Sequence, residues 1–130
     1  MSNSKKEIIR TEKAPAAVGP YSIAVRFGNM IYLSGQIPIN PETGELVGGE
    51  IEQQAHQSLT NIKNVLEAAG SSLEHTLKCT VFLKNMADFS RMNAVYAEYF
   101  KVDPPARSAV EVAALPKGAD IEIEAIAYIP

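Results

Sequence analysis

Two charged side chains, Arg107 and Glu124, stand in segments whose alternation predicts β-strands, and both could act on a small anionic molecule. A guanidinium presents a planar pair of donors that can hold a carboxylate at two points. A carboxylate between Ile123 and Ala125 is either paired or has a raised pKa, and either state suits proton transfer. The spacing also allows structural roles: Arg107 could pair with Glu111 or Glu124, and Glu124 could form a salt bridge where two subunits meet.

The strand that carries Arg107 begins directly after a pair of prolines at 104–105. Alternation places Arg107 and Ala109 on one face of this strand and Val110 and Val112 on the other. We expect the valines to face the core and the arginine to point away from it. The small side chain of Ala109 would leave room for a ligand beside the guanidinium.

Tyr21, Ser34 and Gly35 form a second group of candidates at the ends of predicted strands. Tyr21 follows a Gly-Pro pair, and Gly35 ends a strand where the missing side chain lets a ligand approach the backbone closely. Equally, Gly35 could lie in a β-bulge and Tyr21 could be a packing aromatic.

His56, His75 and Cys79 could carry other chemistry. A ribonuclease of the acid–base type would need the two histidines to converge, and nothing in the sequence brings them together. The single cysteine sits away from both, so we expect no metal site. Without a charged activator nearby, Cys79 is expected to be a buried apolar residue rather than a nucleophile.

The chain has 130 residues, which is enough for one domain spanning 1–130, with residues 1–5 frayed. Its net charge of −3 argues against a surface built for phosphate backbones, so we expect no nucleic-acid partner. No apolar run approaches the roughly 20 residues that cross a bilayer, and the N-terminus lacks an apolar signal segment. The sequence therefore predicts a cytoplasmic protein that does not contact membranes, and it leaves a mitochondrial pool open.

The elements that would position these groups follow the order β-β-β-α-β-α-β-β. A Gly-Asn pair at 28–29 joins two of the strands in a hairpin. Residues 36–49 are predicted to form a loop. Asp88 has the position of an N-cap, and Ser71 and Glu74 have the spacing of a capping box. The predicted strands cover residues 7–11, 22–27, 30–36, 77–83, 107–112 and 120–129, and the predicted helices cover residues 50–69 and 89–100.

This order predicts an α+β two-layer sandwich, in which a six-stranded mixed sheet carries two helices on one face. The last strand then raises a question about the other face. Its odd-numbered residues from Ile121 to Ile129 are all apolar, whereas the even-numbered residues mix Glu122 and Glu124 with Ile126 and Tyr128. A half-apolar second face is most simply explained by an oligomer that covers it.

Three stretches of this chain, in the same order along it, resemble the signatures of one family. They are Ala-Pro-Ala-Ala-Val-Gly-Pro-Tyr-Ser at 14–22, Ile-Tyr-Leu-Ser-Gly-Gln-Ile-Pro at 31–38, and Pro-Pro-Ala-Arg-Ser-Ala-Val-Glu-Val-Ala-Ala-Leu-Pro-Lys-Gly at 104–118 followed by Ile-Glu-Ile-Glu-Ala-Ile-Ala at 121–127. The chain resembles the Rid/YjgF family, and within it the RidA subfamily of reactive-intermediate imine deaminases.

The resemblance implies a chorismate-mutase-like fold, a homotrimer with sites between subunits, and no cofactor or metal. It implies that Arg107 binds the substrate carboxylate and that Glu124 positions or activates water. It also implies that further residues contact the substrate. Many bacterial members carry cysteine where this chain has Ala109, which leaves the backbone N–H as the expected contact there. The implied substrate-binding residues are Tyr21, Ser34, Gly35, Asn93 and Ala109.

The expected activity is hydrolysis of 2-imino acids, formed from enamines such as 2-aminoacrylate that pyridoxal-phosphate enzymes release. The products are 2-keto acids and ammonia. Two alternatives stay open: an endoribonuclease, an activity assigned to some family members, and a non-catalytic trimer that senses keto acids and regulates other proteins.

Overall fold

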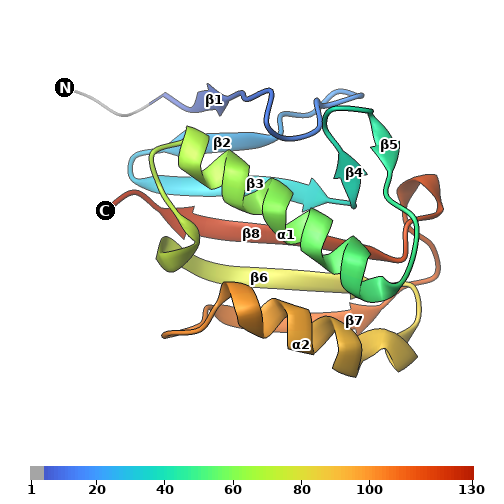
Figure 1. Ribbon diagram of the computed structural model, residues 1–130. Coiled ribbons are helices and arrows are strands. Elements are labelled where there is room, and N and C mark those ends of the chain that lie inside the picture. Colours follow the sequence, from blue (N-terminus) through green and yellow to red (C-terminus); the bar gives the residue numbers. More distant parts are fainter. Residues whose placement is uncertain (1–4) are drawn as a thin grey trace.

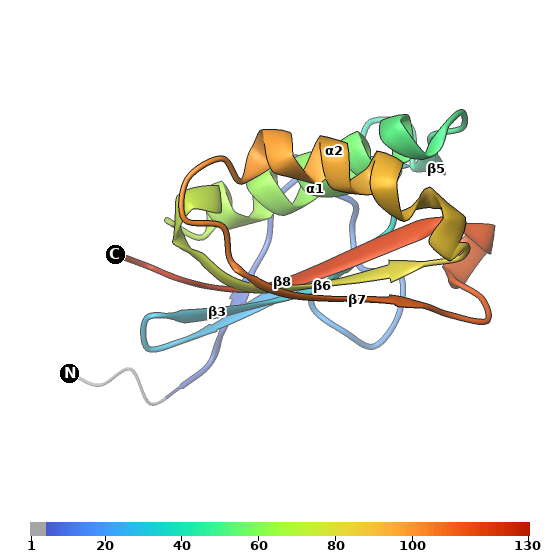
Figure 2. The ribbon, with the colours of Figure 1, turned by 90° about the horizontal axis from the view of Figure 1, so that it is seen from below.

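One mixed sheet carries two α-helices on a single face (Figures 1 and 2). The computed structural model describes residues 5–130, so the predicted fraying of residues 1–5 falls almost wholly outside it. The strand order is β1-β2-β3-β8-β6-β7, and only the β6–β7 pair is parallel. The elements are β1 (Glu7–Ile9), β2 (Ala24–Phe27), β3 (Met30–Gln36), β4 (Ile39–Asn40), β5 (Glu45–Leu46), α1 (Ile51–Ala68), η1 (Leu73–His75), β6 (Thr76–Leu83), η2 (Met86–Asp88), α2 (Phe89–Tyr99), β7 (Ala106–Glu111), η3 (Pro116–Gly118) and β8 (Ile121–Tyr128).

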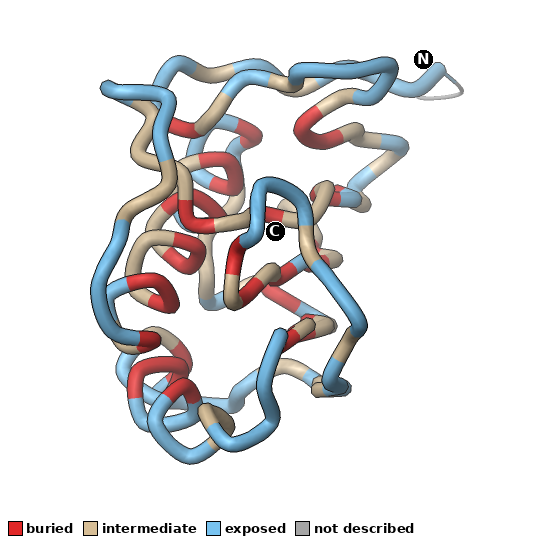
Figure 3. The backbone as a smooth tube through the Cα atoms, turned by 90° about the vertical axis from the view of Figure 1, so that its right-hand side faces the viewer, coloured by how far each residue is buried: buried red, intermediate tan, exposed pale blue. Residues whose placement is uncertain are grey.

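The predicted α+β two-layer sandwich is confirmed, including the six strands of the main sheet and both helices. The apolar residues of α1 recur at helical spacing, so one side of the helix is buried against the sheet. Buried segments of the helices and of the sheet face each other across a common core (Figure 3). Gly28 closes the β2–β3 hairpin with a φ of 62°, a conformation that favours glycine.

The prediction that residues 36–49 are only a loop is wrong, because β4 and β5 pair within it. The side chain of Asn40 accepts from the N–H of Glu42 at 2.8 Å, and its carbonyl accepts from the N–H of Gly44 at 2.8 Å. Gly44 adopts a φ of 76° at this turn. The turn therefore joins two strands that are too short for an alternation of apolar and polar residues to reveal them in the sequence.

Asp88 occupies the N-cap position of α2, as predicted, whereas the predicted capping box at Ser71 is absent. The side chain of Asp88 makes no capping hydrogen bond, whereas Asn85, three residues earlier, accepts from the N–H of Ala87 and caps η2. Ser71 does not form a capping box with Glu74, because its hydroxyl donates to the carbonyl of Tyr128 at 2.7 Å. In both places a short 3₁₀ turn precedes the next element, and Ser72 and Asn85 are the N-caps of these turns.

The two faces of β8 separate as the alternation predicts. Ile121, Ile123, Ala125 and Ala127 are at most 3% exposed and face the helices. No helix covers the other face of the sheet (Figure 2), which carries Glu124 and several half-buried or exposed apolar side chains. We call this second side of the sheet the open face; its large apolar side chains include Phe27, Met30, Tyr32, Phe82, Val110, Ile126 and Tyr128.

Candidate functional site

The guanidinium of Arg107 is held in place by α2, which packs over β7. Its Nη1 donates to Oδ1 of Asn93 at 2.7 Å. The guanidinium carbon lies 4.7 Å from the ring centre of Tyr96 and 5.4 Å from that of Phe89. These three residues recur at helical spacing on α2, so a single helix face orients the arginine through one hydrogen bond and two cation–π contacts.

The remaining donors of Arg107 have no carboxylate partner. Among residues 5–130, neither Glu111 nor Glu124 forms a salt bridge with it, and Glu111 instead accepts from the N–H of Met86 at 2.7 Å. Arg107 and Asn93 line an open cleft of about 360 Å³ next to Pro105. The proposed structural pairing of Arg107 within the chain is therefore wrong, and its planar fork is available to an external anion.

The expected facing of β7 is reversed. Arg107 is paired in register with Cys79 and Ala109 with Val81, and both partners are fully buried on the helix side of the sheet. Val110 is 43% exposed and belongs to the open face. β7 is the edge strand of the sheet, and α2 covers the side of β7 that faces the helices. Valine side chains are therefore not needed to fill that side.

A second group of site residues lies at the far end of β3. Tyr21, Gly35 and Glu122 line one hollow of about 120 Å³, whose other walls are largely apolar. Gly35 sits in a β-bulge, because Leu33 pairs with Ala125 while Gln36 pairs with Ile123, which leaves one extra residue on β3. A side chain at Gly35 would overlap Glu122, since a Cβ there would lie 2.7 Å from the carboxyl carbon.

The carboxylate in this hollow is Glu122 and not Glu124. Burial, followed by the nearby charge of Glu124, raises the pKa of Glu122. Glu124 is exposed and lies two residues further along the same face, in a separate hollow of about 190 Å³ with Lys78, Thr80 and Tyr32. Glu122 could not be selected from the sequence, because both glutamates occupy equivalent positions in the alternation and only the β3 bulge distinguishes them.

Ser34 serves the local backbone in this structure. Its hydroxyl donates to the carbonyl of Ser22 at 2.6 Å, and its N–H donates to the carbonyl of Ile23 at 2.9 Å. These two bonds fasten the segment that carries Tyr21 to the bulge at Gly35. Tyr21 itself is 51% exposed, so its ring is accessible at the edge of the hollow.

The candidate residues thus form two clusters that do not meet within one chain. Ala109 shares a row of the sheet with Val81 and Ile123, and Gln36 next to the bulge lies in the same row. Three strand spacings, about 14 Å, separate β7 from β3 along that row. In addition, Arg107 faces the helices while Glu122 lies on the open face.

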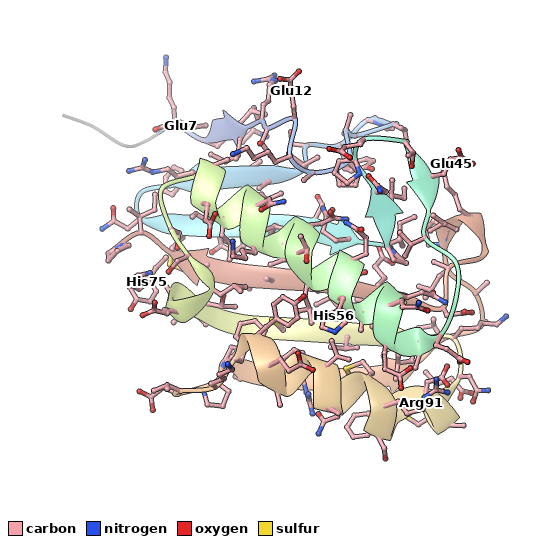
Figure 4. All side chains as sticks on the ribbon, viewed as in Figure 1. Glu7, Glu12, Glu45, His56, His75 and Arg91 are labelled. Atoms are coloured by element: carbon pink, nitrogen blue, oxygen red, sulfur yellow. The ribbon has the colours of Figure 1, made fainter. Side chains whose placement is uncertain are left out.

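The histidines are also apart. His56 Nδ1 lies 2.8 Å from the hydroxyl of Tyr99, whereas His75 Nδ1 lies 2.9 Å from the hydroxyl of Ser72. Figure 4 places His56 on α1 near α2 and His75 in the turn beyond the other end of α1. Within this chain the two rings cannot act together on one substrate.

Cys79 is fully buried, as predicted, and burial raises the pKa of its thiol. The expectation that no charged group lies nearby is wrong, because Arg107 is its register partner on β7. Burial outweighs that charge, so the thiol is not activated.

The described part of the chain contains neither a metal-binding cluster nor a membrane-spanning helix. Within residues 5–130, no three side chains among His, Cys, Asp and Glu gather where they could hold a metal ion. In the same range, none of the helices is both long and apolar enough to cross a membrane.

Comparisons with known proteins give a consistent result. A family model described as endoribonuclease L-PSP matches residues 11–129. The chain is 59% identical to a RutC family protein of Pyrococcus horikoshii, over 95% of this chain and 98% of that protein. It is 51% identical to the 2-iminobutanoate/2-iminopropanoate deaminase of Bos taurus, over 98% and 93% respectively.

A solved structure is similar to this chain in both fold and sequence. The crystal structure of the E. coli YjgF gene product superposes with a TM-score of 0.91 at 51% identity, and the match covers 95% of this chain and 99% of that one. The family match over nearly the whole chain, the relatives and the shared fold agree, and this protein therefore belongs to the Rid/YjgF family.

Proposed function

We propose that this protein hydrolyses 2-imino acids to 2-keto acids and ammonia, in clefts formed between the subunits of a homotrimer. The observation that carries the proposal is the guanidinium of Arg107, which is oriented by Asn93 and two aromatic rings yet has no carboxylate partner among residues 5–130. The bovine relative named a 2-imino acid deaminase supports the same reading.

Arg107 would bind the substrate carboxylate with its free donors. The hydrogen bond to Asn93 and the ring of Tyr96 fix the plane of the guanidinium before a ligand arrives, so little side-chain entropy is lost on binding. The exposed edge of β7 next to Ala109 offers backbone groups to the same ligand. This arrangement selects a planar anion that can accept two parallel hydrogen bonds.

We assign the acid–base role to Glu122 in place of Glu124. Glu122 lies in the hollow with Tyr21 and Gly35, and its raised pKa makes it a better proton acceptor than an ordinary carboxylate. On the open face, Glu124 remains suited to a contact between subunits.

The reaction adds water across the C=N bond and then eliminates ammonia. Glu122 accepts a proton from water as the water oxygen bonds to the imine carbon, and the imine nitrogen takes a proton from solvent, which gives a carbinolamine. Glu122 then gives its proton to the nitrogen, the C–N bond breaks to release ammonia, and the hydroxyl proton passes to solvent as the C=O bond forms. Because such imines hydrolyse readily, positioning and modest acid–base help are sufficient.

The site needs a second copy of the chain, because Arg107 on β7 and Glu122 on β8 are separated by β6 and lie on opposite faces of the sheet. Packing the open faces of three subunits together would cover the exposed apolar side chains of that face and could bring β7 of one chain to the bulge of the next. We place this trimer in the cytoplasm, a setting that the unpaired Cys79 and the acidic composition favour.

An assay with freshly generated 2-aminoacrylate tests the proposal. Purified protein is expected to release 2-keto acid and ammonia faster than buffer does, without added metal or cofactor. Cleavage of RNA by the same preparation, in the absence of imine hydrolysis, would favour the endoribonuclease alternative. Tight binding of keto acids without turnover would favour the sensing alternative.

A further inference from the structure

Tyr96 is a buried tyrosine whose hydroxyl makes no regular hydrogen bond. The residue is 5% exposed on α2, and within residues 5–130 its hydroxyl oxygen has no hydrogen-bond partner of good geometry. A buried hydroxyl without such a partner destabilises the folded chain, whereas phenylalanine would fill the same space without that cost. The hydroxyl of Tyr96 therefore needs an explanation other than packing.

The group that interacts with this hydroxyl is the thiol of Cys79. Burial raises the pKa of the thiol, and the hydroxyl of Tyr96, followed by the charge of Arg107, lowers it in part. Burial and then the thiol raise the pKa of Tyr96, and the charge of Arg107 opposes them. A thiol is a weak hydrogen-bonding group, so the two side chains form a polar pair without the geometry of a full hydrogen bond.

This polar pair lies beneath Arg107. Cys79 and Arg107 are paired in register on β6 and β7, so their side chains leave the sheet next to each other, on the face that the helices cover. The ring centre of Tyr96 lies 4.7 Å from the guanidinium carbon of Arg107. The ring of Phe100 lies 4.7 Å from that of Tyr96, at an interplanar angle of 41°. The Tyr96 ring therefore contacts Arg107 and Phe100, while its hydroxyl interacts with the thiol.

We propose that the thiol of Cys79 and the hydroxyl of Tyr96 form a positioning pair, which holds the Tyr96 ring where it orients Arg107 for binding a carboxylate. Asn93 makes one hydrogen bond to the guanidinium, and the guanidinium plane can still turn about a single bond. A ring face against the guanidinium restricts this rotation only if the ring itself stays in place. The inference rests on the proposed function for the identity of the anion, but the orientation of the guanidinium can be measured without a ligand.

The first measurement is ¹H–¹⁵N NMR of the ligand-free protein. The ring current of Tyr96 shifts the Nε–Hε signal of Arg107, and Arg107→Lys assigns that signal because lysine lacks the group. Cys79→Ala removes the thiol, Cys79→Ser keeps a small polar group, and Tyr96→Phe removes the hydroxyl and keeps the ring. Tyr99→Phe is the matched control, because it removes a hydroxyl on the same helix that lies 2.8 Å from Nδ1 of His56.

We expect the Arg107 signal to move in Cys79→Ala and in Tyr96→Phe, and to keep its parental position in Cys79→Ser and in Tyr99→Phe. In calorimetry, the Kd for pyruvate should rise about 3–10-fold in the first two variants and stay within about twofold of the parent in the other two. The double variant of Cys79→Ala and Tyr96→Phe should bind no more weakly than the weaker single variant, because each substitution breaks the same pair.

Two further readouts separate positioning from folding and from chemistry. Tyr96→Phe should melt at least as high as the parent, because it removes a buried hydroxyl that lacks a full hydrogen bond. In imine hydrolysis, KM should rise in Cys79→Ala and Tyr96→Phe while kcat stays at the parental value, because neither substitution touches Glu122.

Four results would overturn the inference. They are a parental signal and parental affinity in both Cys79→Ala and Tyr96→Phe, single losses that multiply in the double variant, a loss in Cys79→Ser equal to that in Cys79→Ala, and an equal loss in Tyr99→Phe. A parent that neither binds keto acids nor hydrolyses imines, with the NMR signals shifted as expected, would instead contradict the proposed function and leave the positioning pair in place.

Discussion

At the residue scale, Arg107 and Glu122 owe their properties to different neighbours. Arg107 keeps its charge and gains orientation, because its partners on α2 are an amide and two aromatic rings. Glu122 gains basicity, because it is half-buried with no cationic hydrogen-bond partner and with Glu124 close by. One residue is thus prepared to hold an anion and the other to move a proton.

Arg107→Lys should weaken keto-acid binding roughly 30-fold or more. The lysine keeps a positive charge but loses the planar two-point contact and the stacking on Tyr96. Calorimetry with pyruvate or 2-ketobutyrate measures the effect, and light scattering verifies that the oligomer is unchanged. Parental affinity in the variant would mean that Arg107 does not bind the carboxylate.

Glu122→Gln and Glu124→Gln form a matched pair on one face of β8. We expect kcat to fall by about 10²–10⁴ in Glu122→Gln and by less than tenfold in Glu124→Gln, because only Glu122 lies in the hollow. Imine-hydrolysis kinetics on both variants decide between the two glutamates. A larger loss of kcat in Glu124→Gln than in Glu122→Gln would instead assign the acid–base role to Glu124, as expected from the sequence.

The raised pKa of Glu122 also predicts how its substitution affects stability. Because the folded-state pKa of Glu122 is raised, the folded chain binds more protons than the unfolded chain just above the usual glutamate range. Its ionisation therefore destabilises the fold as pH rises through that window. At neutral pH, the melting temperature of Glu122→Gln should be no lower than that of the parent. This result would show that the loss of activity in the variant is not caused by unfolding.

At the element scale, the β3 bulge and α2 place the two clusters. The bulge turns Gly35 toward Glu122, and the hydroxyl of Ser34 ties the Tyr21 segment to it. The helix α2 is fastened to the start of α1 by Arg91, which contacts Glu52 at 2.7 Å and Glu50 at 2.8 Å (Figure 4). Asn93 follows two residues later on the same helix.

Gly35→Ala should impair turnover while leaving stability within about 1 kcal/mol of the parent. The added methyl group would overlap the Glu122 side chain, which is flexible enough to move but would carry its carboxylate out of position. Gly48→Ala is the control, since a Cβ there meets nothing within 4 Å. Thermal melts and kinetics on both variants are the measurements, and equal kcat values for the two would contradict the placement of Glu122.

Alternation and helical spacing predicted every strand of the main sheet and both helices. The failures lie where local geometry interrupts those periods: the paired strands β4 and β5, the 3₁₀ turn η1 that replaces the predicted capping box at Ser71, and the bulge that distinguishes Glu122 from Glu124. The facing of Arg107 was mistaken because β7 is an edge strand, where valine need not point inward. Arg107 could be selected from residue chemistry, whereas the aromatic rings that orient it required the helix–strand packing.

At the scale of the whole molecule, the two clusters and the open face have a common explanation. Arg107 lies on the edge strand β7 and faces the helices, whereas Glu122 lies two strands away on β8 and belongs to the open face, so the two side chains do not meet within residues 5–130. The open face leaves Val110 and Tyr32 more than 40% exposed, at 43% and 47%. An assembly of identical chains would cover these side chains and complete the site.

The assembly itself should be measurable at micromolar concentration. Light scattering is expected to give a mass of three chains, since burial of the open face favours association. Val110→Lys and Tyr32→Lys would place charges on that face and should shift the mass toward the monomer. A parent protein that stays monomeric would remove the physical basis for the proposed clefts.

The most direct test of the central claim is to mix two inactive variants. Arg107→Ala chains keep an intact Glu122, and Glu122→Gln chains keep an intact Arg107. If each site takes Arg107 from one subunit and Glu122 from its neighbour, random mixed trimers contain intact sites, and about a quarter of the parental activity should return after co-refolding at equal amounts. If each site lies within one chain, every site in the mixture carries one of the two substitutions. Imine hydrolysis no higher than the average of the separate variants would then contradict the account.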